Sequence, residues 1–166
     1  MTPKALVLQK HTRIDWKGLE HSLHEHFGVN AVTLKKNGQR ITAGDIPWAN
    51  DLCALIKKNP TGSSKICDTL KMYLIHEAEA KRRYATEECA AGIFRIVVPI
   101  IRINQTEGFI SVCGRPFSNA DRIYTFYIHK TIDEDEEKIK DLLASLAPIG
   151  PRTIKEMKQF ITGYVH

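Results

Sequence analysis

The sequence predicts an α+β fold, in which a mainly antiparallel sheet of about five strands has helices inserted in the middle and packed at both ends. Apolar residues recur with helical spacing near both ends of the chain, whereas residues 84–114 are rich in β-prone runs. One run, residues 93–103, is nearly all apolar, which is typical of a strand covered on both faces. The chain has neither an internal repeat nor a long linker, so residues 1–166 are predicted to form one domain.

A helix and a hairpin are expected first. Asp15 can cap a helix over residues 15–27, and Gly28 can end it. The buried stripe of this helix is expected to contain Trp16, Leu19, Leu23 and Phe27. An Asn-Gly pair lies between two β-prone runs and predicts a hairpin with arms at residues 30–35 and 39–43.

Two helices are expected between this hairpin and the central strands. The shorter one is expected to open at residues 45–47 and to end at residues 59–62. Ser63 or Ser64 can cap a longer helix that runs to about Ala80. One face of the shorter helix is expected to present Trp48, Leu52, Leu55 and Ile56. The apolar face of the longer helix is expected to present Ile66, Cys67, Leu70, Tyr73, Leu74 and Ala78.

Strands dominate the centre of the chain. The strands expected there are residues 84–89, 93–103 and 109–114. A bend at Ala91 and Gly92 separates the first two, and a turn at residues 104–108 separates the last two. Residues 123–128 are a candidate for a further strand that extends the sheet.

The C-terminal part is predicted to be helical. Residues 133–146 open with five acidic residues, which suit the positive end of a helix dipole. After a break at residues 148–151, Thr153 and Glu156 have the spacing of a capping box for a last helix over residues 153–164. We expect this last helix to be the output surface or the contact of a homodimer.

Composition and charge exclude several classes of protein. Hydrophobic residues make up 43% and charged residues 26%, which excludes a disordered chain, a collagen and a long coiled coil. The longest apolar run is far shorter than a membrane span, and the N-terminus lacks the features of a signal peptide. We therefore expect a cytoplasmic protein without membrane contact. The net charge of +5 permits nucleic-acid binding, but no aromatic residues interleave with the basic ones, so none is expected.

Catalytic motifs are not recognisable. The sequence contains no Gly-x-Ser-x-Gly, no phosphate-cradling glycine loop and no His-Glu-x-x-His, so an enzyme is not expected. His21, His24 and His26 are interpreted as parts of a solvated helix surface, because residues two apart on a helix point in different directions. His76 remains a candidate pocket or haem ligand.

The sequence contains four cysteines but no Cys-x-x-Cys pair. These cysteines are the residues best suited to metal binding or redox chemistry. In a reducing compartment they are expected to be thiols. Cys53, Cys67 and Cys89 are open to three interpretations, namely packing or pocket lining, a soft-metal or iron–sulfur centre, or redox sensing. Cys113 lies within an apolar strand and is expected to belong mainly to the core.

The middle of the chain resembles the PocR sensory domain family. The similarity extends from about Asp15 to Tyr164, and its most specific part is Cys-x-x-Gly followed by an apolar strand that contains Pro-Ile. The matching segments are residues 52–53, 64–67, 88–93, 98–100, 108–112 and 114–117.

The resemblance implies a fold and a role. Members of this family have a PAS-like fold, are thought to bind small organic molecules, and usually sit beside DNA-binding, kinase or cyclic-dinucleotide output domains. They commonly carry an acidic residue shortly after Cys-x-x-Gly, where this chain has Phe94 and Arg95. The ligand is therefore expected to differ from that of other members.

These observations lead to the hypothesis of a cytoplasmic sensory domain that binds a small, largely apolar molecule between the sheet and the inserted helices. The residues expected to line its pocket are Trp48, Cys53, Cys67, Tyr73, Cys89, Gly92, Phe94 and Cys113. No catalytic residue, metal ligand or cofactor is predicted, and the partners expected are the ligand and either a second copy or an output protein. The alternative is a redox sensor with a cysteine-ligated metal, an iron–sulfur cluster or haem.

Overall fold

An antiparallel sheet forms the centre of the fold, which is α+β as the sequence predicts. The computed structural model describes residues 13–117 and 124–165. The strand order in these residues is β1 (Asn30–Leu34), β4 (Gln105–Pro116), β3 (Ile93–Arg102) and β2 (Ala85–Glu88). All neighbouring strands are antiparallel. The described part of the sheet thus has four strands, close to the expected five.

The long β3–β4 hairpin is buried on both faces, as its apolar sequence predicts. Ile96 packs against one hydrophobic cluster, and the next residue, Val97, packs against another on the opposite face. The turn is tighter than expected. It is made by Ile103 and Asn104, whose φ angles are 48° and 61°, and β4 already begins at Gln105 rather than after a turn over residues 104–108.

Only one arm of the expected N-terminal hairpin becomes a strand. The predicted turn forms, but residues 39–43 contribute no more than an isolated bridge between Arg40 and Leu34. Two backbone bonds still join the arms, from the Ile41 N–H to the Thr33 carbonyl at 2.9 Å and from the Lys35 N–H to the Gln39 carbonyl at 2.8 Å. Beyond them the buried carboxylate of Glu20 accepts from both arms, from Thr33 Oγ1 at 2.8 Å and from Thr42 Oγ1 at 2.6 Å.

The helix α1 (Trp16–Phe27) has the predicted bounds. Its first turn is capped by Asp15, whose Oδ1 accepts from the Gly18 N–H at 3.0 Å. Gly28 ends the helix in the left-handed conformation, with φ of 62°. Of the predicted stripe, Leu19 and Leu23 are fully buried, which packs α1 against the sheet.

The inserted helices differ most from the prediction. They are α2 (Asp51–Lys58), α3 (Pro60–Gly62), the π-helix η1 (Ser63–Asp68) and α4 (Thr69–Lys81). The first begins after Asn50, not at residues 45–47, because the Asn50 side chain provides its cap. The next three follow one another directly. Asn59 caps the start of this run, so neither Ser63 nor Ser64 has the predicted capping role.

The π-helix changes which residues of α4 face the core. A π turn contains one more residue than an α turn, so the positions that follow are rotated about the helix axis. Leu74 and Ala78 are buried as predicted, but Tyr73, expected on the same face, is 55% exposed, whereas Ile75 is fully buried. The buried face of α4 is therefore only partly the predicted one.

The C-terminal helices are α5 (Tyr124–Ile132), α6 (Glu136–Ala144) and α7 (Pro151–Val165). The prediction of a strand over residues 123–128 is wrong for residues 124–128, which belong to α5, and Ile123 lies outside the described residues. The buried residues of α5 are Thr125, Ile128 and Ile132, at helical spacing. The acidic run contributes Asp135 as the cap of α6. The capping box at Thr153 does not form, because α7 already begins at Pro151.

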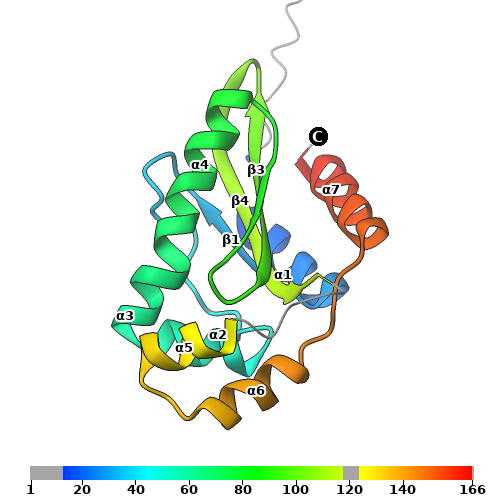
Figure 1. Cartoon of the computed structure of the whole chain (residues 1–166). Coiled ribbons are helices and arrows are strands. Elements are labelled where there is room, and N and C mark those ends of the chain that lie inside the picture. The colour runs from blue at the N-terminus through cyan, green and yellow to red at the C-terminus, as the bar shows by residue number, and fades with distance from the viewer. Residues whose placement is uncertain (1–12, 118–123, 166) are drawn as a thin grey trace, which may run out of the picture.

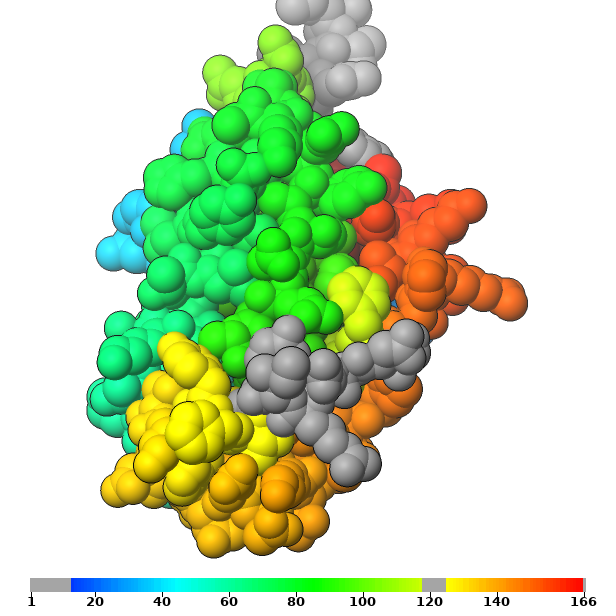
Figure 2. All heavy atoms as spheres, in the orientation of Figure 1, coloured from blue at the N-terminus to red at the C-terminus, as the bar shows by residue number. Residues whose placement is uncertain are grey.

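Figure 1 shows the arrangement of these elements around the sheet. The helix α4 covers one face, and α1 and α7 lie on the other. The helices α2, α5 and α6 gather at one end, where they enclose a third hydrophobic cluster together with η1 and the β2–β3 turn. In Figure 2, α5 and α6 form the lower end of the molecule in yellow and orange, and α7 protrudes at the side in red. None of the helices in the described ranges is long and apolar enough to cross a membrane.

Candidate ligand-binding site

All four cysteines line one cavity in the third hydrophobic cluster. Cys53 comes from α2, Cys67 from η1, Cys89 from the turn after β2, and Cys113 from β4. The other residues that line this cavity are Ile56, Ile66, Ile93 and Arg95. We call it the four-cysteine cavity. Its volume is about 20 Å³, roughly the space of one water molecule.

A β-bulge sets the geometry of one wall of the four-cysteine cavity. Between two regular pairs of the β3–β4 ladder, the single residue Arg95 on β3 faces both Cys113 and Gly114 on β4. Gly114 has a φ of 109°, which a residue with a side chain rarely adopts, and an added Cβ would lie 2.9 Å from Asn30 Nδ2. The bulge therefore depends on glycine at this position.

Asn50 connects the bulge to α2. Its Oδ1 accepts from the Cys53 N–H at 2.7 Å, which caps the helix, and its Nδ2 donates to the Gly114 carbonyl at 2.8 Å. The same amide nitrogen lies 3.4 Å from Cys53 Sγ. One side chain thus fixes the distance between the Cys53 wall and the Cys113 wall.

The third wall is the turn between β2 and β3. The Gly92 N–H donates to the Cys89 carbonyl at 2.8 Å, and the Cys89 N–H donates to the Ile93 carbonyl at 2.8 Å. Gly92 has a φ of 76°, which confirms the bend expected at this point. Gly92 shapes the turn but is not among the residues that line the cavity.

Among the described residues, Arg95 is the only charged one that lines the four-cysteine cavity, and it is 7% exposed. Its Nη1 donates to the Cys67 carbonyl at 2.7 Å, and its Nη2 makes a long contact of 3.8 Å with Cys113 Sγ. Its Nε is buried without a hydrogen-bond partner. Burial lowers the pKa of Arg95, but the sulfurs of Cys113 and Cys67 raise it, and the net pKa lies above its ordinary value. The guanidinium therefore stays charged.

Burial keeps three of the thiols protonated at neutral pH. It raises the pKa of Cys53, to which the neighbouring Cys113 also contributes, and it raises the pKa of Cys67. It also raises the pKa of Cys89 to about 11. All four cysteines are free thiols. The cavity thus combines three neutral thiols, the sulfur of Cys113, apolar isoleucines and one buried positive charge.

Three of the residues expected to line the pocket lie elsewhere. Trp48 is 41% exposed and borders a surface hollow of about 360 Å³ near the start of α2. Phe94 is buried on the opposite face of the sheet, where its ring lies edge-on to Phe117 at 4.7 Å between centroids. It follows that Phe94 and Arg95, adjacent in sequence, belong to different faces.

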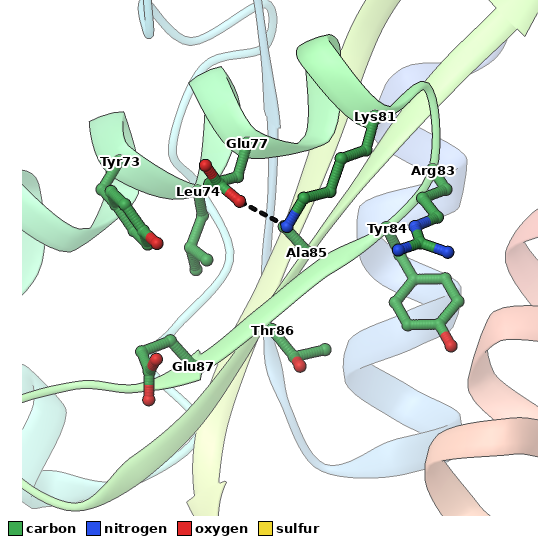
Figure 3. Close-up of a pocket in the computed structure, with 9 residues that line it drawn as sticks. All are labelled: Tyr73, Leu74, Glu77, Lys81, Arg83, Tyr84, Ala85, Thr86 and Glu87. Atoms are coloured by element: carbon green, nitrogen blue, oxygen red, sulfur yellow. Dashed lines mark ion pairs between the residues drawn. The ribbon is translucent and has the colours of Figure 1, made fainter.

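Tyr73 lines a surface groove of about 430 Å³ between α4 and β2 (Figure 3). The groove is larger than the four-cysteine cavity but is bordered by charged side chains, among them Glu77 and Lys81, which form an ion pair. Such exposed pairs are screened by water and hold little binding energy. We therefore regard the four-cysteine cavity as the candidate site.

The histidines in residues 13–117 and 124–165 lie outside this cavity. His24 Nδ1 hydrogen-bonds the Val29 carbonyl at 3.0 Å, and His26 Nδ1 hydrogen-bonds the Ser22 carbonyl at 2.8 Å. His76 is exposed on α4. In residues 13–117 and 124–165, no group of three or more His, Cys, Asp or Glu side chains is placed so that it could hold a metal ion.

The sequence analysis missed Asn50 and Arg95 as members of the site. Arg95 could have been identified from the sequence, because it interrupts an otherwise apolar strand and a charged residue is seldom buried without a specific role. Asn50 left only the general preference of asparagine for helix caps.

Comparison with known families agrees with this architecture. Residues 14–166 match a family model of sensory domains, which assigns the protein to the sensory components of signal transduction. The matched model is described as the sensory domain found in PocR, and the chain belongs to this family. The extent of the match confirms the resemblance noted between Asp15 and Tyr164. No curated protein and no solved structure matches the chain, so the PAS-like fold stays a prediction.

Proposed function

We propose that the protein is a ligand-sensing domain that binds a small organic molecule at the four-cysteine cavity. The observation that carries the proposal is the convergence of four cysteines from four separate chain segments on one largely apolar cavity. The proposed role is binding without catalysis, in the cytoplasm, with residues 1–166 acting as one domain.

The size of the cavity requires a wall to move when a ligand of several atoms binds. With a volume of about 20 Å³, it holds one small group without rearrangement. The π-helix η1, which carries Cys67, is the wall best suited to move, because π turns are less stable than α turns and often occur at functional sites. Lys57 holds η1 through Asp68 at 3.2 Å and Ser63 at 3.4 Å.

A route from the cavity to α7 supports the expectation that this helix is the output or homodimer surface. Cys113 is followed by the bulge and then by Arg115, whose Nε and Nη2 donate to the Ala147 and Pro148 carbonyls at 3.1 and 2.6 Å. These two residues precede α7. A ligand that favours a different arrangement of the bulge would therefore shift the start of α7.

Native mass spectrometry of the purified chain tests this proposal, together with thermal unfolding in the presence of short alcohols, diols and carboxylic acids. A bound small molecule, or a melting temperature that rises saturably with one of these compounds, is the expected result. Cys113→Val, which fills the cavity with a residue suited to a strand, should abolish the shift. Ser64→Ala, on the exposed side of η1, is the matched control and should retain it.

Metal analysis of the same protein sample distinguishes the competing function, a metal or redox sensor, from the proposed one. Four sulfurs around one cavity favour it, although their present arrangement does not form a metal site. Stoichiometric zinc, copper or iron in anaerobically purified protein, lost in Cys67→Ala or Cys89→Ala, would replace the organic ligand as the signal. A metal-free protein that binds an organic compound would support the proposal above.

A further inference from the structure

The four-cysteine cavity is bordered by the buried guanidinium of Arg95, which has no negative partner among the residues that the structure describes. No carboxylate in residues 13–117 or 124–165 forms an ion pair with Arg95, and one N–H of its guanidinium, at Nε, has no acceptor. Burying a charge without a partner is costly, because the protein interior does not replace the lost hydration. Such a group points to a partner that binds from solution.

Two carboxylates that lie beside the site in register or in sequence are engaged elsewhere. Glu87 is the register partner of Arg95 across β2 and β3, but it is exposed, and its Oε1 accepts from the Glu88 N–H at 3.1 Å. Asp68, adjacent to Cys67 on η1, pairs with Lys57 at 3.2 Å and with Lys71 at 3.3 Å. These pairs leave the charge of Arg95 uncompensated.

Three of the surrounding thiols do not supply the missing charge either. Burial raises the pKa of Cys53, Cys67 and Cys89, so these groups carry their protons at neutral pH. As thiols they are weak hydrogen-bond donors, and they can turn their S–H groups toward an acceptor in the cavity. Cys53, Cys67 and Cys89 therefore contribute neutral donors near a cation.

We propose that the four-cysteine cavity takes a small monovalent anion, of which formate is the simplest organic example. The inference rests on the proposed function and specifies its ligand class. The Nε–H of Arg95 is buried beside the apolar surface of the present cavity, so one anionic oxygen would accept it once a wall of the cavity has moved, and the isoleucine walls would strengthen this charge-assisted bond by excluding water. The present volume of about 20 Å³ holds about one water-sized group, so even an anion of a few heavy atoms requires η1 to move.

Charge distinguishes this ligand from a neutral one of the same size. Methanol can accept the same hydrogen bond, but it leaves the guanidinium charge uncompensated. Formate satisfies both the hydrogen bond and the charge. The two compounds therefore separate an anion site from a site that recognises shape and polarity alone.

Thermal unfolding of the full chain at constant ionic strength provides the test. Sodium gluconate, whose anion is too large for the cavity, is replaced stepwise by sodium formate, and by sodium chloride in a parallel series. At about 100 times its Kd, formate should raise the melting temperature by roughly 5 to 10 °C. Methanol at the same concentrations should have no comparable effect.

Two variants assign the effect to the guanidinium. Arg95→Gln should abolish the formate shift, and Arg152→Gln, which removes one positive charge from a side chain that is 92% exposed, should retain it. If Arg95→Gln does not fold, the comparison of formate with methanol on the wild-type chain still shows whether the site requires a negative charge.

The outcomes separate this inference from the proposed function. Stabilisation by formate supports both. Stabilisation by chloride alone supports the anion site but overturns an organic ligand. Equal shifts with methanol and formate, or a formate shift that persists in Arg95→Gln, overturn the anion and leave the proposed function standing. No shift in any series, with no small molecule in the native mass spectrum, overturns both.

Discussion

Asn50 combines a helix cap with a hydrogen bond to a second element of the candidate site. Asn50→Ala is therefore predicted to lower the free energy of unfolding more than an ordinary cap mutation does. The side chain caps α2 through the Cys53 N–H and donates to the carbonyl of Gly114 in the bulge. Alanine removes both bonds and releases α2 from β4 beside Cys113.

The magnitude follows from the two bonds. Loss of a helix cap costs about 1 kcal/mol, and loss of the donor to a part-buried carbonyl costs roughly 1 to 2 kcal/mol more. We expect a total decrease of about 2 to 3 kcal/mol in the free energy of unfolding, which for a chain of this length lowers the melting temperature by roughly 5 to 10 °C.

Urea denaturation of two further variants tests how the loss of stability divides between the helix cap and the bond to Gly114. Asp135 caps α6 through the Lys138 N–H at 2.9 Å, and the structure gives its side chain no second bond. Asp135→Ala should therefore cost only about 1 kcal/mol. Asn50→Asp keeps the cap acceptor and loses the amide donor, so it should fall between wild type and Asn50→Ala.

A second measurement connects this contact to the cavity. Cys53 should react faster with a thiol reagent in Asn50→Ala than in the wild type, because α2 opens locally. The reasoning would be refuted if Asn50→Ala cost no more than Asp135→Ala, or if Asn50→Asp were as stable as the wild type.

Two further predictions concern a close approach and a thiol. Gly62→Ala would place a Cβ 2.6 Å from Ile132 Cγ2 and 2.7 Å from the Ile56 carbonyl oxygen. It should therefore lower the free energy of unfolding, measured by urea denaturation, by about 1 to 3 kcal/mol. Gly163→Ala, whose Cβ would have no atom within 4 Å, should leave this free energy unchanged or raise it slightly. The Cys89 thiol has a pKa of 9.0 when unperturbed and about 11 in the fold, so the folded state retains this proton to higher pH. Stability should therefore fall by up to roughly 3 kcal/mol as the pH rises from 9 to 11. Cys89→Ala should lose this component of the pH dependence, and an unchanged slope in that variant would contradict the burial of the thiol.

The sequence predicted half of the candidate site for identifiable reasons. Cys53, Cys67 and Cys89 were chosen because thiols are chemically distinctive and because they lie in the segments that resemble the family. Trp48 and Tyr73 were chosen for their place on helical stripes, and both predictions failed, because α2 begins later than expected and η1 rotates the helix that follows. A boundary or a π turn is decided by side-chain bonds to distant residues, which local periodicity does not contain.

The sequence by itself determined the class of fold, the capped helix α1, the doubly covered strand β3 and the bend at Gly92. Each depends on residues close together in the chain, whose spacing and backbone preferences act locally. The tertiary structure alone decided that β4 bulges opposite Arg95, that Asn50 bonds to Gly114, and that four cysteines meet at one cavity. These contacts join residues up to 64 positions apart, and their geometry is fixed only when the strands pair and the helices pack.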